Sequence, residues 1–97
     1  MRAPRPEGPG ESFRKPREWV RRWFEAKGSI PGATIAEKLA VDYFEAGLID
    51  SLAIVGLVGE IETEFSVRFE DRHYREPRFS TIGGLADIIA ELAAARR

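Results

Sequence analysis

The sequence predicts a small all-α protein with a single core. Apolar residues recur at spacings of three and four in three segments, and a proline or a capping residue stands where each segment begins. No run of residues alternates convincingly between apolar and polar, as a half-buried strand would. A chain of 97 residues buries only about 60 to 65% of the surface that its unfolded form exposes, which leaves room for one small domain.

The first helix is expected to begin near Pro16, because the N–H that proline lacks has no partner in the first turn of a helix. One face of this helix carries four apolar residues, Trp19, Val20, Trp23 and Phe24. Gly28 is expected to end the helix. Residues 1–15 form a flexible basic tail rich in proline and glycine, whose few apolar groups cannot offset the entropy of ordering it. The folded domain is therefore expected to span residues 16–97.

A long connection follows the first helix and runs from Ser29 to Ile49. Its many apolar residues favour a segment pinned to the core over a free loop; they are Ile35, Leu39, Val41, Tyr43, Phe44, Leu48 and Ile49. Thr34 and Glu37 have the spacing of a capping box, so a short helical turn is expected there.

The second main helix is expected to begin after Asp50, an acidic cap. Five apolar residues at helical spacing form its core stripe: Ile54, Leu57, Val58, Ile61 and Phe65. An irregular stretch with Val67 and Phe69 then leads to a single helical turn at Glu70 to Tyr74, and Pro77 is expected to stop it.

The last helix is expected to be capped by Ser80. Its apolar residues again recur at helical spacing: Ile82, Leu85, Ile88, Ile89 and Leu92. Arg96 and Arg97 fall at its end, where the helix dipole favours cations. The expected fold is thus a small bundle of three main helices and one short third helix, with a long loop between the first two.

Composition excludes several classes of function. The chain has no cysteine and one histidine, His73, which rules out a disulfide scaffold, a cysteine nucleophile and a histidine or cysteine metal cluster. No apolar run approaches the roughly 18 to 20 residues of a membrane span, and the first residues lack the apolar core of a signal peptide. We therefore expect a cytoplasmic protein that binds no metal. The short length disfavours a large self-contained enzyme, and we expect a monomer.

The most informative stretch runs from Asp42 to Leu52, because it delivers a serine to the first turn of a helix directly after an acidic cap. Ser51 is expected to present an exposed hydroxyl there, and unpaired N–H groups at a helix start favour a phosphate ester on that oxygen. A plainer interpretation is that Asp50 and Ser51 are only a pair of capping residues.

A second face of the same helix favours the functional interpretation. Two interior glycines, Gly56 and Gly59, each cost roughly 1 kcal/mol of helix stability relative to alanine. Either they allow close packing within the protein, or they belong to an apolar surface that docks partner proteins. The residues expected to bind partners are Leu52, Ala53, Val55, Gly56, Gly59 and Glu62.

With Gly47-Leu48-Ile49 before Asp50-Ser51-Leu52, the chain resembles the acyl carrier protein family. The resemblance extends from about Trp19 to Leu92 and includes the order of the helices. The segment from Tyr43 to Ser51 looks most like stand-alone carriers of the D-alanyl type and small carriers of specialised pathways. The resemblance implies the four-helix bundle of that family.

The resemblance also implies a function. A phosphopantetheinyl transferase would attach 4′-phosphopantetheine from coenzyme A to Ser51, with Asp50 as part of the motif. An activating ligase would then load an acyl or aminoacyl group as a thioester, and downstream acyl-transferring enzymes would receive it. The imported thiol agrees with the absence of cysteine. The sequence identifies neither the cargo nor the pathway.

One departure from the family concerns charge. Fatty-acid carriers usually have acidic residues soon after the serine, where this chain has Ala53 and Gly56, and its acids come later, from Glu60 onward. This favours a dedicated pathway with a more apolar interface over the general fatty-acid carrier.

Three other functions compete. A helical adaptor that binds a partner through the apolar face and carries no prosthetic group needs only that face. Nucleic-acid binding through the basic residues around Trp19 and Trp23 is disfavoured, because the net charge is −1 and both tryptophans have core spacing. A hydrolase using Ser51 and His73 lacks a Gly-x-Ser-x-Gly turn. His73 is expected to be a surface or partly packed residue.

Overall fold

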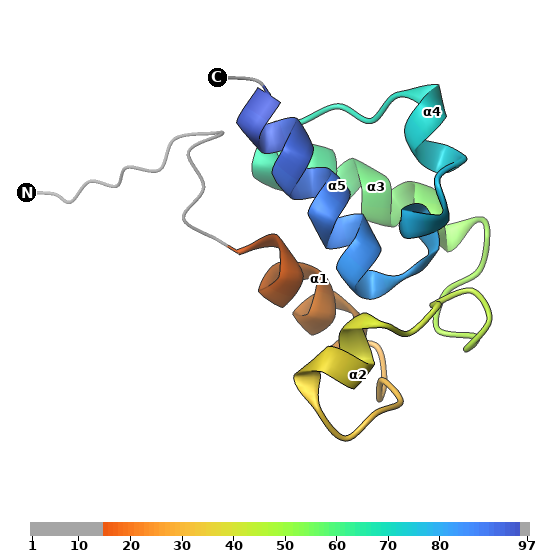
Figure 1. Ribbon diagram of the computed structural model, residues 1–97. Coiled ribbons are helices and arrows are strands. Elements are labelled where there is room, and N and C mark those ends of the chain that lie inside the picture. Colours follow the sequence, from red (N-terminus) through yellow and green to blue (C-terminus); the bar gives the residue numbers. More distant parts are fainter. Residues whose placement is uncertain (1–14, 96–97) are drawn as a thin grey trace, which may run out of the picture.

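The computed structural model describes residues 15–95, and that part of the chain is all-α, as predicted. The elements are α1 (Pro16–Glu25), α2 (Ile35–Leu39), α3 (Ala53–Phe65), α4 (Asp71–Tyr74), the 3₁₀ turn η1 (Pro77–Ser80) and α5 (Ile82–Ala95) (Figure 1). Within this range there is no strand, and the one bridge joins Asp42 to Thr81. The predicted tail, apart from Lys15, and the predicted cations Arg96 and Arg97 lie outside the described residues.

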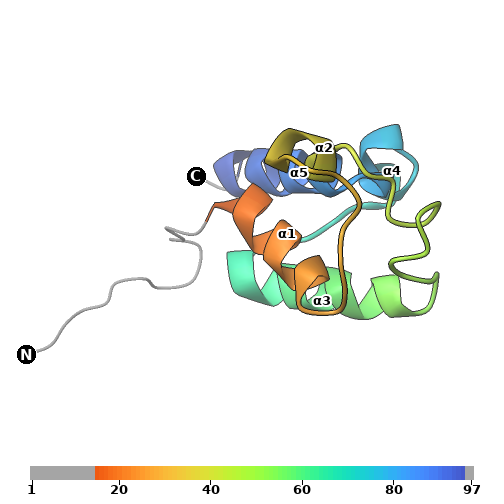
Figure 2. The same cartoon turned by 90° about the horizontal axis from the view of Figure 1, so that it is seen from below.

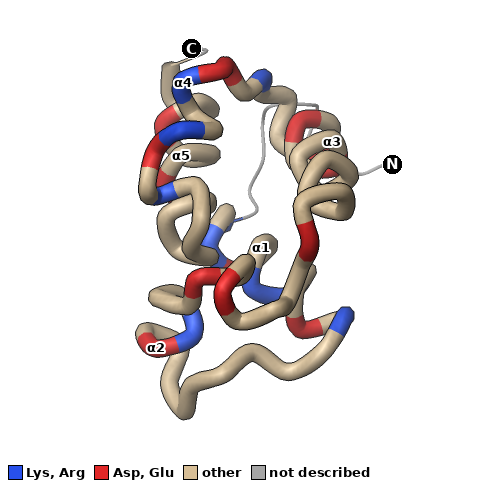
Figure 3. The backbone as a smooth tube through the Cα atoms, turned by 90° about the vertical axis from the view of Figure 1, so that its right-hand side faces the viewer, with Lys and Arg blue, Asp and Glu red and all other residues tan. Residues whose placement is uncertain are grey.

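The three long helices enclose one core. In Figures 2 and 3, α3 lies on one side of the molecule and α5 on the other, with α1 between them. The predicted stripe of α3 is buried at all five positions, and that of α5 is buried except at Leu92, which is half-buried. Helical spacing of apolar residues therefore identified the core sides of both helices.

Helix α1 begins at Pro16, as predicted, but ends earlier than expected. Its last residue is Glu25, and Ala26 follows as the C-cap. Gly28 lies beyond the helix in a turn, where its N–H donates to the Phe24 carbonyl over 3.1 Å. The turn closes without a glycine in the left-handed region, so Gly28 is not the residue that ends α1.

The long connection is pinned to the core, as predicted, at a subset of its apolar residues. Tyr43 and Ile49 are buried, whereas Ile35 and Phe44 remain 51% and 37% exposed. The Tyr43 N–H donates to the Ser80 carbonyl over 3.0 Å, and the Ile82 N–H donates to the Val41 carbonyl over 3.2 Å. These two bonds fasten the connection to the end of η1 and the start of α5.

The predicted capping box opens α2. Thr34 Oγ1 accepts from the Glu37 N–H over 3.1 Å, and Glu37 Oε1 accepts from the Thr34 N–H over 3.3 Å. Lys38 Nζ donates to Glu25 Oε2 over 3.3 Å, which ties α2 to the end of α1. Local capping, this ion pair and the half-buried Leu39, which packs against the core, thus hold a helix with no fully buried residue.

Tyr43 anchors the connection through its ring. The ring is fully buried and stacks on Phe24 with 5.0 Å between centroids. Its hydroxyl has no hydrogen-bond partner among the described residues. Burial, with the nearby Asp42 carboxylate, raises the pKa of Tyr43 above its ordinary value, so the phenol stays neutral.

The predicted cap of the last helix is wrong by one residue. Thr81, not Ser80, caps α5: its Oγ1 accepts from the Gly84 N–H over 2.9 Å, and its carbonyl accepts from the Leu85 N–H over 2.8 Å. Ser80 instead ends the 3₁₀ turn that Pro77 begins. That turn moves the cap one position along the chain, so Pro77 starts an element where the sequence indicated only a stop.

The prediction for His73 is also wrong, because this side chain is only 4% exposed. Its Nδ1 accepts from the Glu70 N–H over 2.8 Å, which caps the short helix α4, and its ring lies edge-on to Phe69. A neutral ring nitrogen can accept this bond, whereas a protonated one cannot. His73 is therefore a buried structural residue.

Gly84 allows the closest approach in the fold. A Cβ built at this position would lie 2.2 Å from the Arg78 carbonyl oxygen and 2.6 Å from Thr81 Oγ1. At Gly56, by contrast, an added Cβ would meet no heavy atom within 4 Å. The two glycines make a matched pair, since both lie in helices and only one has a backbone atom in the way.

We expect Gly84→Ala to lower the free energy of unfolding by about 1–3 kcal/mol or more, because η1 must move away from α5. Gly56→Ala should instead raise it by up to about 1 kcal/mol, since alanine is the better helix former. Urea unfolding followed by circular dichroism measures both. Equal effects of the two substitutions would contradict the close approach at Gly84.

Arg78 joins η1 to α5. Its guanidinium donates to both carboxylate oxygens of Glu91, over 2.6 and 3.0 Å, and also pairs with Glu76. The hydrogen bonds from Arg78 hold the pKa of Glu91 below its ordinary value of 4.5. This pair is therefore more stabilising with Glu91 ionised.

Because the pKa of Glu91 is lower in the folded state, its contribution is present above pH 4.5 and is lost as the pH falls through the folded value. We expect the melting temperature of the wild type to fall more steeply below pH 4.5 than that of Glu91→Gln. High salt should reduce the difference, because the pair is exposed. Parallel curves at low salt would show that the pair contributes nothing.

Candidate functional site

Ser51 is exposed at the start of α3. Asp50 Oδ1 accepts from the backbone N–H groups of Leu52 and Ala53 over 3.1 and 2.7 Å. The Ile54 N–H donates to the Asp50 carbonyl over 3.1 Å, which makes Asp50 the N-cap by geometry and Ser51 the first residue of the turn. The predicted cap is thus confirmed, and it holds the backbone on both sides of the serine.

The same bonds change one electrostatic expectation. Two of the N–H groups at the start of α3 already have the Asp50 carboxylate as their acceptor. A phosphate ester on Ser51 would therefore compete with Asp50 for them, although the dipole of α3 still favours negative charge at this end. Stabilisation of an anionic group on Ser51 therefore depends also on cations near the site.

The face of α3 opposite its core stripe is apolar and exposed. We call it the outer face: Leu52, Ala53, Val55, Gly56 and Gly59. Leu52 is 81% exposed and Val55 is 66% exposed. No charged residue occurs between Asp50 and Glu60, so the backbone of α3 is tan over that stretch in Figure 3. An uncharged surface therefore begins directly beside Ser51.

The two interior glycines of α3 have no packing partner in the described part of the chain. A Cβ added at Gly56 or at Gly59 would meet no heavy atom within 4 Å. Close packing against α4 or against the long connection, the alternative raised by the sequence, does not account for them. The two glycines therefore lower the stability of the helix without allowing a closer contact within the described structure.

Glu62 differs from the other residues expected to bind partners. It is half-buried, and its Oε2 accepts from the Phe69 N–H over 2.9 Å. This bond holds the segment that leaves α3 against the helix. Glu62 thus has a structural partner within its own chain, whereas the residues of the outer face have open surroundings.

A groove lies beside Ser51 that the sequence did not indicate. It holds about 600 Å³ and is lined by Trp23, Lys27, Phe44, Gly47, Leu48, Ile49, Asp50 and Ala53. Its residues come from two segments distant in sequence: Trp23 and Lys27 at the end of α1, and the continuous stretch 44–53 that leads from the long connection into α3. The available signal was Phe44, an aromatic residue just before the serine motif.

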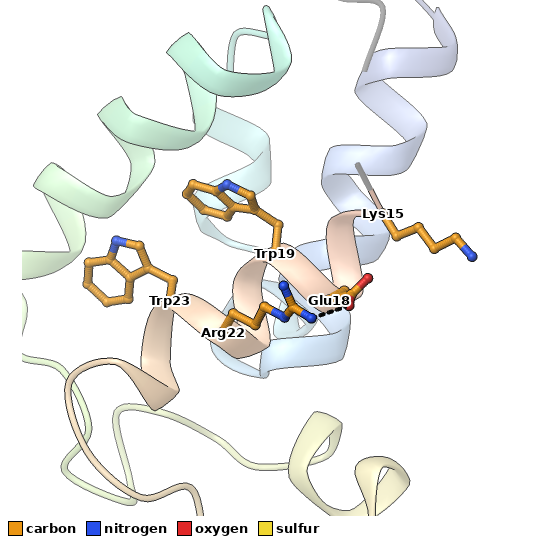
Figure 4. Close-up of a pocket in the computed structure, with 5 residues that line it drawn as sticks. All are labelled: Lys15, Glu18, Trp19, Arg22 and Trp23. Atoms are coloured by element: carbon orange, nitrogen blue, oxygen red, sulfur yellow. Dashed lines mark ion pairs between the residues drawn. The ribbon is translucent and has the colours of Figure 1, made fainter. Parts of the chain in front are cut away.

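The basic residues of α1 are largely paired, which weighs against nucleic-acid binding. Arg17 donates to Asp87 over 3.1 Å, Arg21 pairs with Glu25 over 2.9 Å, and the Arg22 pair with Glu18 is drawn in Figure 4. These pairs neutralise much of the positive charge that the sequence concentrates there.

Figure 4 also shows both tryptophans pointing from α1 toward α3. Trp19 lies edge-on to Phe65 with 5.6 Å between centroids, and Trp23 Nε1 donates to Glu60 Oε1 over 3.0 Å. Rings held in this way are poorly placed to stack on bases.

A hydrolase gains no support from the geometry. His73 is buried and its Nδ1 is occupied by the Glu70 N–H, while Ser51 is exposed at the start of another helix. Across residues 15–95, no group of three or more His, Asp or Glu residues is arranged to hold a metal ion. None of the helices in this range has the length and apolar character needed to cross a membrane.

Comparison of the chain with protein-family models, with curated proteins and with solved structures gave no match.

We expect Leu52→Asp and Val55→Asp to change the free energy of unfolding by no more than about 0.5 kcal/mol, because both side chains are exposed. Leu57→Asp, a buried position on the same helix, should unfold the protein. Thermal melting followed by circular dichroism separates these outcomes. Loss of helicity in either of the first two variants would show that the outer face is packed.

Proposed function

We propose that this protein is a carrier that holds an acyl or aminoacyl group as a thioester on 4′-phosphopantetheine attached to Ser51. The observation that carries the proposal is the exposed serine in Asp50-Ser51-Leu52 at the start of α3, beside an uncharged outer face. The protein itself catalyses no reaction. It presents its cargo to the enzymes of a dedicated pathway.

The fold supports this proposal in its general order. Three main helices, α1, α3 and α5, are joined by a long connection and by the short helix α4, which is the order expected of an acyl-carrier bundle. The short helix α2 and the turn η1 are additional elements. We assign the chain to the acyl-carrier type on this order and on the serine motif, with stand-alone carriers of the D-alanyl kind as the nearest model.

Ser51 fits the attachment chemistry. In the transfer step, a base of the phosphopantetheinyl transferase takes the hydroxyl proton. The Ser51 oxygen forms a bond to the phosphorus that bears the pantetheine, and 3′,5′-adenosine bisphosphate leaves from coenzyme A. The attached group supplies a thiol for thioester formation, which a chain without cysteine cannot supply itself. Asp50 keeps the serine at the first turn of α3, where the transferase can reach it.

The outer face is the surface that we assign to partner enzymes. A transferase, an activating ligase and downstream acyl-transferring enzymes must each approach Ser51 in turn. Leu52 and Val55 offer apolar contacts next to it, and Gly56 and Gly59 let a partner's backbone or side chain come close to the helix. A monomeric, cytoplasmic carrier is consistent with such transient contacts.

A second candidate is a helical adaptor without a prosthetic group. It is favoured by the same glycines, because a bare helix face can bind a partner helix whether or not Ser51 is modified. The two candidates differ in one observable, the covalent state of Ser51.

We expect the purified protein to gain the mass of one phosphopantetheinyl group when incubated with coenzyme A and a broad-specificity phosphopantetheinyl transferase. Peptide mapping should place the group on Ser51. Ser51→Ala should gain nothing, and Ser29→Ala, which removes another exposed serine, should be modified as the wild type is. An unmodified wild type across several transferases would favour the adaptor.

A further inference from the structure

The groove beside Ser51 has the size of a small-molecule site. Its volume of about 600 Å³ lies within the range of roughly 300–1,000 Å³ that such sites have. Ile49 and Asp50 line it on one side of Ser51 in the sequence, and Ala53 lines it on the other. Leu52 and Val55 are not among its lining residues. A group bonded to Ser51 therefore starts next to this groove, which shares only Ala53 with the outer face.

One wall of the groove is the indole of Trp23. Its Nε1 donates to Glu60 Oε1 over 3.0 Å, and its ring lies edge-on to Phe24 with 5.1 Å between centroids. These two contacts, one to α3 and one to the core, fix the orientation of the ring. The wall exists before any ligand arrives.

Phe44 forms another part of the lining. This side chain is 37% exposed and lies against Tyr43 with 5.0 Å between centroids. Asp42 Oδ1 accepts from the backbone N–H groups of Phe44 and Glu45 over 3.0 and 2.9 Å, which holds the turn that presents the ring. Phe44 is thus an exposed aromatic residue on a fixed backbone.

Gly47 keeps its part of the groove open. Its φ of +73° lies in the left-handed region that side chains disfavour, and a Cβ added there would meet no heavy atom within 4 Å. The turn is closed by bonds from the Gly47 N–H to the Phe44 carbonyl and from the Leu48 N–H to the Tyr43 carbonyl. The position therefore requires glycine for its backbone and leaves space above it.

The groove also carries a cation. Lys27 Nζ lies 4.6 Å from the centroid of the Trp23 ring, and within residues 15–95 no carboxylate forms an ion pair with it. Among the described residues that line the groove, Asp50 is the one acid, and its Oδ1 already accepts two backbone N–H groups. The lining thus suits an occupant with an anionic end and a largely apolar chain.

We propose that the 4′-phosphopantetheine arm on Ser51 rests in this groove, with its phosphate toward Lys27 and its chain between Trp23 and Phe44. This inference rests on the proposed function, because it needs the arm. Resting there, the arm covers Ala53 and leaves Leu52, Val55, Gly56 and Gly59 clear for partner enzymes. Storage of the arm and docking of enzymes then use largely different surfaces.

The two tryptophans provide an internal control for a test. In ¹H–¹⁵N spectra, conversion of the apo protein to the phosphopantetheinylated form should shift the indole N–H signal of Trp23. The indole signal of Trp19 should stay in place, because that ring lies against Phe65 at the far end of α3. Backbone signals of Phe44 and Gly47 should shift with Trp23, and high salt should reduce the shifts by screening Lys27.

A matched pair of substitutions tests the role of Lys27. Lys27→Glu should abolish or greatly reduce the Trp23 shift, because the phosphate would meet a like charge. Arg22→Glu makes the same change of charge on α1 outside the groove and should leave the shift intact. Both positions are exposed, so the apo spectrum and the melting temperature check that each variant folds.

Each result decides between the two proposals. If mass spectrometry shows Ser51 modified while the signals of Trp23, Phe44 and Gly47 stay unchanged, the groove assignment is overturned and the carrier function stands. If Ser51 is never modified, both are overturned. A Trp23 shift that persists in Lys27→Glu overturns the phosphate contact.

Discussion

The cap that Asp50 forms on α3 is the interaction on which the site depends. One carboxylate oxygen accepts two backbone N–H groups and thereby sets where the helix starts. With that start fixed, the apolar stripe from Ile54 to Phe65 faces the core, and Ser51 falls in the first turn on the exposed side. Because successive residues of a helix lie about 100° apart, burial of this stripe also fixes the direction in which the residues of the first turn point. The position of the serine and the burial of the stripe are therefore one constraint.

A second constraint lies at the other end of the connection. The end of η1 and the start of α5 hold residues 41–43 through backbone bonds, while Gly84 lets η1 pack directly on α5. The buried ring of Tyr43 adds the core contact that keeps this part of the connection in place. Phe44 and Gly47 follow Tyr43 closely in the sequence. The shape of the groove beside Ser51 therefore depends on packing at the start of α5.

The charge pattern of α3 distinguishes the proposed carrier from the general fatty-acid type. Its acids occur late in the helix, and two of them are occupied within the protein: Glu60 by the Trp23 indole and Glu62 by the Phe69 N–H. What remains near Ser51 for a partner to contact is apolar and small. A complementary enzyme surface would therefore be apolar, with specificity arising from shape more than from charge.

The sequence by itself determined the features that depend on neighbours along the chain. Helical spacing identified the buried stripes of α3 and α5, Pro16 marked the start of α1, and the capping box of Thr34 and Glu37 marked α2. Each of these signals is local, since a helix repeats every 3.6 residues and a cap acts within one turn. The exposed position of Ser51 followed from the same local logic.

Tertiary structure decided what depends on segments distant in sequence. It moved the cap of α5 from Ser80 to Thr81, because η1 packs against α5 and takes up one more residue. It also buried His73 and brought Trp23 and Lys27 next to the stretch 44–53 to form the groove. No periodicity encodes such contacts, because they form only when the whole core packs. The local sequence thus identifies the serine, whereas the groove beside that serine forms only in the folded molecule.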